Sequence, residues 1–422
     1  MSKSPFAYQI PDGYVACGGQ LRLYPNQTIR TKFYQSFGNK RYVWNHFKTC
    51  FDERYKNNDQ LPFPDKKTLS YLLTQLKQEH PFLRKSDSTS LQVALDDYSR
   101  AQWDFMKHKT HDQGRPRFKG LHYYKQTYTS RANKATRTGL MSIRIIDDHH
   151  VLLPKIGKVK TSLTKCFANY TILRATVTWR QDRDIFLLSF NGIKPKPHKL
   201  PKTGKSVGID VGLGNEWLVL SDGTRFGVPN TVKADQKARH WQSLTDRRVS
   251  RLKSVIAHRN HKFPDNPITK YEFSNWQRSR STKAKYAIKQ ANIRLDNIRK
   301  AVKYLVANYD VIVIEDLKVK NLMHNHHLAH SIANACWSEF RRILAYECNW
   351  YDKRLITIHP AYTSRICSNC NQINPNFNHL ATNKWLAIRS WTCPFCHTYH
   401  DRDVNAAKNI LMRGLKQLTT IS

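Results

Sequence analysis

The hydrophobic pattern of the N-terminal half changes from a strand to helices and then to short strands. Residues 20–25 (Q-L-R-L-Y-P) alternate apolar and polar positions before a proline, which predicts a short strand that ends there. From residue 28 to about residue 108 the apolar positions follow a helical period. Short alternating runs between residues 142 and 190, separated by turn residues, predict a small antiparallel β-domain.

A connector rich in proline and lysine, residues 193–203, precedes the C-terminal half, and we place the main domain boundary there. After a predicted strand hairpin at 205–223, a long stretch carries apolar residues at alternating steps of three and four. This spacing predicts a helical seam, with the 241–258 helix as its partner and a proline-containing loop over 263–280 between them. The seam positions are Ile288, Ala291, Leu295, Ile298, Val302 and Leu305.

Helices then alternate with strands. Residues 309–315 form a continuous apolar run that ends in an acid, which suits a central strand buried on both faces. Residues 331–350 have a helical pattern and residues 354–358 return to a strand. The C-terminal half is therefore predicted to be an α/β domain.

The charge of the chain points to a polyanionic partner. Seventy Lys and Arg residues against 31 Asp and Glu give a net charge of +39, a field that favours nucleic acid. A membrane-surface protein is the alternative, but the sequence has no long apolar run and no signal peptide, so we expect a cytoplasmic protein with no membrane partner. Residues 114–120 carry Arg115, Arg117 and Lys119 around Phe118, a composition typical of a loop that contacts phosphates, although a plain basic linker would look the same.

Four of the nine cysteines are arranged for a metal. Cys367 with Cys370, and Cys393 with Cys396, form two C-x₂-C pairs at the spacing of a zinc ribbon, whereas the other five are scattered. Four thiolates leave no open coordination position. We therefore predict one structural Zn²⁺.

Three acids are candidates for catalysis. Asp210 lies on an apolar strand, where a buried carboxylate is costly unless it is paired or binds a metal; a solvated Asp at a strand end is the alternative. Glu315 ends a later strand, and Asp401 or Asp403 opens the last helix. Carboxylates that converge from such elements are what a two-metal phosphodiester hydrolase requires, and their order is that of ribonuclease-H-like nucleases.

The whole chain resembles TnpB, a family of RNA-guided DNA nucleases encoded by insertion sequences and akin to compact type V CRISPR effectors. The resemblance rests on motifs spread along the chain. In order they are L-R-L-Y-P-N (21–26), R-Y-V-W-N-H-F (41–47), R-P-R-F-K (115–119), G-I-D-V-G-L (208–213), I-E-D-L (314–317), S-I-A-N-A-C-W-S-E-F-R-R (331–342), R-S-W-T-C-P-F-C (389–396) and D-R-D-V-N-A-A-K-N-I (401–410).

The resemblance implies a multidomain α+β fold. Residues 1–30 would supply the N-terminal strand of a wedge domain, 31–120 a helical recognition domain, and 121–203 the rest of the wedge, a small antiparallel β-barrel. Residues 204–422 would form an RNase-H-like (RuvC) α/β nuclease domain with a zinc-ribbon insert at 363–400. The chain departs from the family at Asn371 and His397, where glycine is usual, and in the long 263–280 loop; the first 15 or so residues have no counterpart.

The resemblance also assigns residues. It places the RuvC triad at Asp210, Glu315 and Asp403, which would bind Mg²⁺, two ions being expected, with Asp401 and Asp316 as neighbours. The implied function is cleavage of double-stranded target DNA, directed by a transposon-derived guide RNA and by a short target-adjacent motif. Contacts to that motif are implied for four residues: Phe63, Gln92, Lys125 and Gln126.

Three other functions stay open at this point. One is a catalytically silent RNA-guided repressor, although all three acids are present; the second is a compact type V CRISPR effector; the third is a transposase. We expect one protein chain per guide RNA, with a dimer as the alternative.

Overall fold

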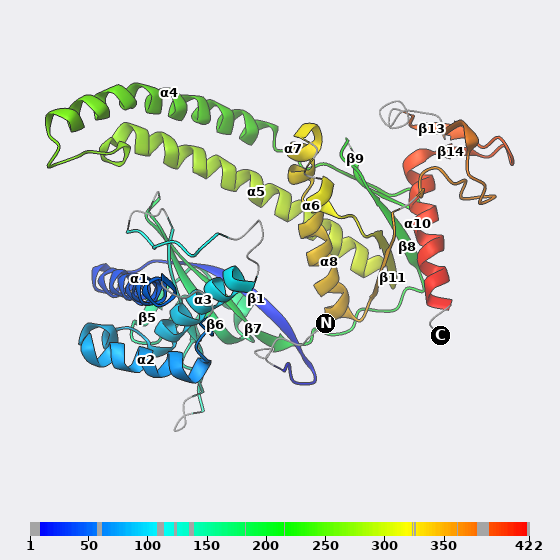
Figure 1. Cartoon of the computed structure of the whole chain (residues 1–422). Helices are drawn as coiled ribbons and strands as arrows, with labels where there is room; N and C mark the ends of the chain where they lie inside the picture. Colours follow the sequence, from blue (N-terminus) through cyan, green and yellow to red (C-terminus); the bar gives the residue numbers. More distant parts are fainter. Residues whose placement is uncertain are drawn as a thin grey trace. The chain divides into compact units, whose positions relative to one another are not determined.

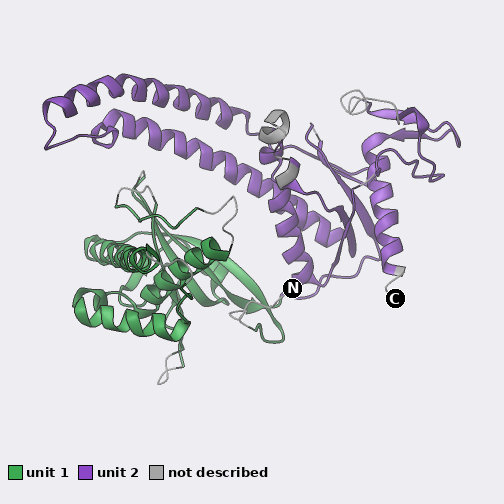
Figure 2. Cartoon of the chain, in the orientation of Figure 1, with its two compact units in different colours: residues 1–196 green, residues 197–422 purple. Residues whose placement is uncertain are grey.

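The computed structural model describes residues 9–56, 61–107, 114–121, 125–134, 139–181, 183–214, 216–322, 324, 326–360, 362–377 and 388–419. The chain forms two compact units, residues 1–196 and 197–422 (Figure 2). The division falls within the 193–203 connector. Among the described residues, no helix has both the length and the apolar character needed to cross a membrane.

In the described part of unit 1, three α-helices combine with two antiparallel sheets, β1-β7-β6-β2 and β3-β4-β5. Its elements are β1 (Tyr14–Leu23), α1 (Gln27–Lys56), α2 (Lys66–Glu79), η1 (Pro81–Lys85), α3 (Ser88–Lys107), β2 (Lys125–Arg131), β3 (Arg144–Asp147), β4 (His150–Leu153), β5 (Gly157–Lys160), η2 (Lys165–Phe167), β6 (Thr171–Arg180) and β7 (Ile185–Pro195).

Helix α1 belongs to both hydrophobic cores of unit 1. Its N-terminal half inserts Phe33 and Phe37 into the core that the two sheets share. Its C-terminal half packs Trp44 and Phe47 against α2 and α3. The helical block predicted from the sequence is therefore joined to the sheets through one continuous helix.

The first strand is longer than the predicted strand at 20–25. β1 pairs with β7 along its whole length, from Tyr14 opposite Pro195 to Leu23 opposite Phe186, and this pairing also carries β7 into the predicted connector. Gly18 and Gly19 interrupt the alternation of apolar and polar residues in β1, so the sequence pattern did not show its first half. Glycine is required at position 19 because the Phe190 and Phe167 rings cover the backbone where a Cβ atom would lie.

Unit 2 is built on a five-stranded sheet of order β10-β9-β8-β11-β12, in which β8, β11 and β12 are parallel. Its elements are β8 (Ser206–Val211), β9 (Glu216–Leu220), β10 (Arg225–Gly227), α4 (Val232–Lys262), η3 (Lys270–Glu272), α5 (Ser274–Asn308), β11 (Val311–Glu315), α6 (Val319–Leu322), α7 (His326–Ala335), α8 (Trp337–Tyr351), β12 (Arg354–Ile358), η4 (Pro375–Phe377), β13 (Ser390–Thr392), β14 (Tyr399–Asp401) and α10 (Arg402–Thr419).

The two faces of this sheet carry different helices. Val207, Ile209, Ile312 and Ile314 form one large core with α5 and α8. On the opposite face Val313 packs with Ile358 and with Ile410 of α10. The alternation of side chains along each strand therefore separates an α5/α8 face from an α10 face.

The predicted seam is used differently from the expectation. Ile298, Val302 and Leu305 are buried, but against the sheet, whereas Ala291 is exposed. Helix α4 does lie beside α5 (Figure 1), yet among its described residues only Ala234 and Thr245 are buried. The partner helix was therefore predicted correctly, but the buried part of the apolar stripe packs against the sheet and not against α4.

The loop predicted over 263–280 is shorter. Helix α5 begins at Ser274, after a capping box formed by Thr269 and Glu272. Trp276 and Ser279, which the prediction left in the loop, are buried in the first turns of the helix. The prolines at 264 and 267 prevent α4 from continuing, but they lie before Ser274 and do not prevent a new helix from starting there.

Helix α10 approaches β8 closely at Gly208. A Cβ atom at this position would overlap the carbonyl oxygen of Ala407 and lie 2.6 Å from the Leu411 backbone nitrogen. Both are backbone atoms of a helix, so they cannot move aside as a flexible side chain would. Glycine at 208 is what allows α10 to lie on the sheet.

We predict that Gly208→Ala lowers the free energy of unfolding of unit 2 by about 1–3 kcal/mol, the usual cost of overpacking. Gly214→Ala is the matched control, because its added Cβ would meet nothing closer than the Arg389 guanidinium at 3.7 Å. Urea unfolding of the two variants and the unaltered protein measures the difference. Equal stability of all three would show that the contact is not tight.

Candidate functional site

Asp210 and Glu315 lie next to each other at the carboxyl ends of adjacent parallel strands. β8 and β11 are in register up to Ile209 and Ile314, so the two acids occupy the next position on each strand. Each is two residues beyond a position on the α10 face, Gly208 and Val313, and therefore faces α10 as well. Both side chains are half-buried.

Asp403 comes to the same end of the sheet from the first turn of α10. It lies four helical residues, about 6 Å, before Ala407, which contacts Gly208. Asp210 lies two strand residues, about 6.6 Å, beyond Gly208. The Asp403 and Asp210 carboxylates are thus at similar heights, and the charges of Asp403 and Glu315 both act on the pKa of Asp210.

The electrostatics of this centre favour a bound cation. The pKa of Asp210 is raised from 3.8 to about 7, chiefly by burial and also by the neighbouring charges of Glu315 and Asp403. Burial also raises the pKa of Glu315. Three carboxylates in this position repel one another, and either a proton or a metal ion relieves the repulsion.

Neighbouring side chains hold the acids in place. The Thr363 hydroxyl donates to Glu315 Oε1 at 2.7 Å, and Asn409 Nδ2 donates to the Thr363 carbonyl oxygen at 2.7 Å. Arg402 donates from Nε to Asp403 Oδ1 at 2.9 Å. The sequence analysis missed Thr363, Arg402 and Asn409, although Asn405 and Asn409 stand one turn apart among apolar residues of the last helix and are both buried.

The two neighbouring acids have structural partners. Asp401 accepts hydrogen bonds from the backbone N–H groups of Asp403 and Val404 at 3.1 and 2.9 Å, and so caps α10. It also receives Arg225 Nη2 at 2.9 Å. Asp316 is paired with Arg341. Asp401 therefore caps a helix and Asp316 forms an ion pair, whereas Asp210, Glu315 and Asp403 lie at the end of the sheet beside the start of α10.

The four predicted zinc ligands come together. Among the described residues, Cys367, Cys370, Cys393 and Cys396 are the only group of three or more His, Cys, Asp or Glu side chains whose ligand atoms all lie within 4.8 Å of one another. The Sγ atoms of Cys367 and Cys396 are 3.6 Å apart. A tetrahedral site with Zn–S bonds of about 2.3 Å requires roughly 3.8 Å. Four thiols at this separation suit Zn²⁺.

The three acids do not meet the distance criterion that the four cysteines meet. The carboxylate oxygens of Asp210, Glu315 and Asp403 do not all lie within 4.8 Å of one another. Their oxygen chemistry fits a hard cation such as Mg²⁺, which binds through one or two carboxylates together with water and substrate phosphates. The three acids therefore do not form a close ligand cluster of the kind that the four cysteines form.

Both departures from glycine in the cysteine pairs adopt the left-handed conformation. Asn371 has φ of 60° and His397 has φ of 53°. Each donates its backbone N–H to the carbonyl oxygen of the first cysteine of its pair, at 2.9 and 3.0 Å. Asn and His are among the residues that tolerate this region, so the turns form without glycine.

His400 is a further residue that the sequence analysis did not identify. Its Nε2 lies 3.0 Å from Cys367 Sγ, and its ring packs on Trp391 with 4.7 Å between ring centroids. It is buried and directly precedes Asp401. The cysteine cluster is therefore connected to the start of α10 through one residue.

In unit 1, the basic segment at 114–120 is fixed on α1. The Trp44 indole donates to the Arg117 carbonyl oxygen at 3.0 Å, and Asn45 accepts from the Lys119 backbone N–H at 2.8 Å. The Lys119 ammonium lies 3.2 Å from the centroid of the Trp44 ring, and burial lowers its pKa to about 7. Arg115 and Arg117 remain exposed. The segment presents these two arginines on an ordered backbone, while Lys119 has a packing role.

The four residues implied in recognition of the adjacent motif differ in exposure. Lys125 is exposed, and Gln92 is half-buried with its Nε2 donating to Asp96 at 3.0 Å. Phe63 stacks on Phe51 with ring centroids 5.2 Å apart. Gln126 is buried; its Oε1 accepts from Arg41 at 2.6 Å and its Nε2 donates to the Leu121 carbonyl oxygen at 3.0 Å. This arrangement argues against a direct base contact by Gln126. Nothing in the sequence pattern indicates that this polar side chain is buried.

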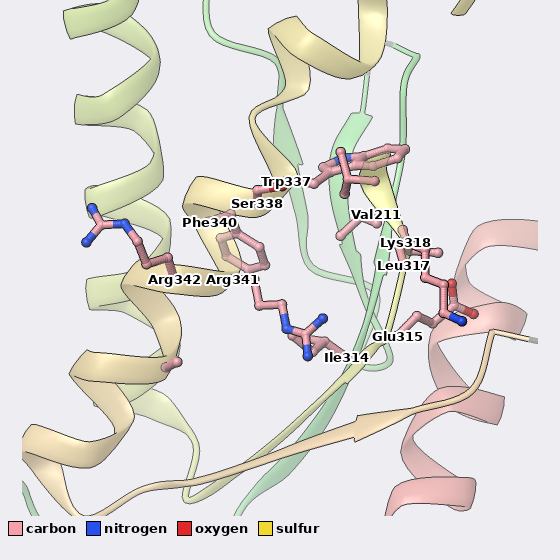
Figure 3. Close-up of a pocket in the computed structure, with 12 residues that line it drawn as sticks. Val211, Ile314, Glu315, Leu317, Lys318, Trp337, Ser338, Phe340, Arg341 and Arg342 are labelled. Carbon is pink, nitrogen blue, oxygen red and sulfur yellow. The ribbon is translucent and has the colours of Figure 1, made fainter. Parts of the chain in front are cut away.

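A pocket of about 600 Å³ opens beside Glu315 (Figure 3). It lies on the α5/α8 side of the sheet end, between β11 and α8. Its lining residues are Val211, Ile314, Glu315, Leu317, Lys318, Val319, Trp337, Ser338, Phe340, Arg341, Arg342 and Ala345. Glu315 is thus shared between this pocket and the group of acids.

Three family models match the chain. Residues 18–60 match a helix-turn-helix domain model, residues 190–326 match the OrfB_IS605 model, described as "Probable transposase", and residues 337–410 match the model described as "Cas12f1-like, TNB domain". Together they include Asp210, Glu315, Asp403 and the four cysteines.

Similar proteins include a "Putative RNA-guided DNA endonuclease" of Streptomyces pristinaespiralis, 33% identical over 245 residues, which are 57% of this chain and 53% of that protein. This chain therefore spans about half the length of that relative. "Putative RNA-guided DNA endonuclease InsQ" of Escherichia coli is 26% identical over 418 residues, 94% of this chain and 91% of that protein. A solved Cas12f1-sgRNA-target DNA complex gives a TM-score of 0.46 at 13% identity, covering 94% of this chain and 99% of that chain.

We predict that the raised pKa of Asp210 makes the metal-free protein less stable as the pH rises through about 7. Between the ordinary pKa and the folded value, the folded state binds more protons than the unfolded state, so stability falls with pH. Asp210→Asn removes this titration. In EDTA-treated protein its Tm should exceed that of the unaltered protein at pH 8, and the gap should close toward pH 5. A gap that is the same at both pH values would contradict the assignment.

We predict one Zn²⁺ per purified chain, measured by elemental analysis. Cys367→Ser or Cys393→Ser should reduce the zinc content and lower the Tm of unit 2 by roughly 5 °C or more, since each kcal/mol is worth about 2–4 °C in a unit of this size. Cys166→Ser is the control, because Cys166 is exposed and lies outside the cluster. Zinc-free protein of unchanged stability would refute the site.

Proposed function

The chain belongs to the TnpB family, and on this basis we propose that it is an RNA-guided DNA endonuclease that cuts double-stranded DNA at one RuvC site. The observation that carries the proposal is the meeting of three acids at one end of the unit 2 sheet. Asp210 and Glu315 end adjacent parallel strands, and Asp403 opens the helix packed on them. Burial is the main cause of the raised pKa of Asp210, and the charges of Glu315 and Asp403 add to it.

The strand arrangement supports an RNase-H-like assignment for unit 2. An antiparallel pair, β9 and β10, extends from β8, and the parallel strands β11 and β12 lie on its other side. Residues 204–422 would then be the nuclease domain with the ribbon at 363–400. Residues 31–120 would be the recognition domain, and the first 30 residues would form the wedge together with 121–203.

Asp210, Glu315 and Asp403 would hold the catalytic Mg²⁺, two ions being the expected number. When bound, Mg²⁺ supplies an activated water and stabilises charge on the attacking and leaving oxygens. Thr363 keeps one oxygen of Glu315 oriented through its hydrogen bond, and Arg402 fixes the Asp403 carboxylate.

The nucleic acid partners follow from charge. A net charge of +39 can hold a guide RNA and its heteroduplex with target DNA through their phosphates, while base pairing reads the target sequence. Helix α4 is suited to phosphate contact, since Arg239, Arg247 and Arg251 line a hollow on its surface. Arg115 and Arg117 are suited to it in unit 1.

We assign recognition of the adjacent motif to Gln92, Lys125 and Phe63. Gln92 can pair with adenine and Lys125 with guanine or phosphate. Gln126 would act indirectly, by holding Arg41 at 2.6 Å. The zinc ribbon would have a structural role, because four thiolates complete the coordination of Zn²⁺.

Two neighbouring functions can be separated from this one. A catalytically silent RNA-guided repressor would not require the three acids that the chain retains. A compact type V CRISPR effector would share the chemistry, and the match to the Cas12f1-like model favours keeping it as the second candidate. Sequencing the DNA that flanks the gene distinguishes transposon ends from a repeat array.

We predict that Asp210→Ala, Glu315→Ala and Asp403→Ala each lower the cleavage rate at least about 100-fold, a loss of roughly 2.7 kcal/mol of transition-state stabilisation. Binding of guide RNA and target should stay within a few-fold, since these acids bind metal. The measurement is cleavage of a labelled duplex by protein purified with its co-expressed guide RNA.

Asp401→Ala is the matched control for this experiment. It removes a helix cap and an Arg225 contact from the same segment and should reduce cleavage less. If Asp401→Ala abolished cleavage and Asp403→Ala did not, the third acid would be Asp401.

A further inference from the structure

We propose that the pocket beside Glu315 is a nucleotide subsite that receives the base next to the scissile phosphate of the DNA strand being cut. The proposal rests on the proposed nuclease function and adds a role for the 331–342 motif. Trp337, Ser338, Phe340, Arg341 and Arg342 of this motif all line the pocket. The group of acids uses none of them.

The position of the pocket limits what can occupy it. Glu315 sits at the end of β11, where the α10 face and the α5/α8 face of the sheet meet. If the acids hold a phosphate on the α10 side, the strand can continue across the end of the sheet. The neighbouring nucleotide would then lie on the α8 side, at the pocket. Figure 3 shows Glu315 beside α10 and the Trp337 and Phe340 rings across the strand end.

The walls suit a nucleobase. The volume of about 600 Å³ is within the range of ligand pockets, about 300–1,000 Å³. Val211, Leu317, Val319 and the two aromatic rings make the wall largely apolar in a chain of mean hydropathy −0.64. Apolar and aromatic walls accept the face of any base, as a nuclease with guide-specified targets requires.

The polar groups of the pocket suit the rest of the nucleotide. Trp337 is 8% exposed, and its indole N–H is buried without a hydrogen-bond partner among the described residues. Arg341, which lines the pocket, is paired with Asp316, whereas the Arg342 guanidinium extends toward α5 and is paired with Glu339 at 2.6 Å (Figure 3). Lys318 adds positive charge at the pocket for a flanking phosphate.

The test fills the pocket from its exposed side. Ser338→Trp and Ala345→Phe add bulk at two exposed lining positions, while Asn349→Phe adds the same bulk at an exposed α8 position outside the pocket. Each variant is purified with guide RNA and assayed with Mg²⁺ for target binding and for single-turnover cleavage. We expect the two filled variants to cut at least 10-fold more slowly with target binding within two-fold, and Asn349→Phe to match the unaltered protein.

A second measurement asks whether the occupant is a base. Targets with one abasic site at successive nucleotides around the cut are given to the unaltered protein and to Ser338→Trp. One position should slow the unaltered protein by a factor similar to that of filling, and the same position should not slow Ser338→Trp further. Independent, multiplying effects would overturn the proposal, because they would show that the base and the pocket do not meet.

The other outcomes are also decisive. Filled variants that cut at the unaltered rate, or that lose target binding in proportion to cutting, would overturn the subsite, the latter by showing a role in assembly with RNA or DNA. Failure of the unaltered complex to cut any target would overturn the nuclease function itself. The two failures are therefore distinguishable.

Discussion

The contact of α10 with β8 at Gly208 is the constraint on which the rest of unit 2 depends. It brings backbone against backbone, which only glycine permits, and it fixes the height of the helix on the sheet. Asp403 is placed by that height, because it lies about one turn before the contact. The acids therefore meet through main-chain geometry, and the side chains around them adjust only the orientation of each carboxylate.

A chain of hydrogen bonds connects this centre with the cysteine cluster. Asn405 accepts from the Ser368 backbone N–H at 2.9 Å, inside the first cysteine pair. Asn409 holds the carbonyl oxygens of Thr363 and Ile366, and Thr363 donates to Glu315. The segment next to the cysteine cluster thus carries the hydroxyl that orients an acid. Loss of the cluster should therefore disturb the orientation of Glu315.

The sequence identified what depends on residue type and failed where tertiary pairing decides. The paired cysteines and the acids at the ends of apolar strands can be recognised from the residues next to them. The structure places the four thiols together. The length of β1 depends on β7, far along the chain, and the burial of Gln126 depends on Arg41. The apolar stripe on α5 could be recognised from the sequence. Its spacing does not show whether a sheet or a helix covers it. Asn409 was missed because a buried amide looks like any surface asparagine.

The order of the acids along the chain has a consequence for synthesis. A ribosome delivers β8 and β11 well before α10, so for much of translation the growing polypeptide exposes a bare sheet face with two acids and no third. Until α10 emerges, the nascent polypeptide therefore lacks the third acid of the proposed site, while unit 1 has already been synthesised. A stop codon before residue 402 would likewise yield a product without Asp403.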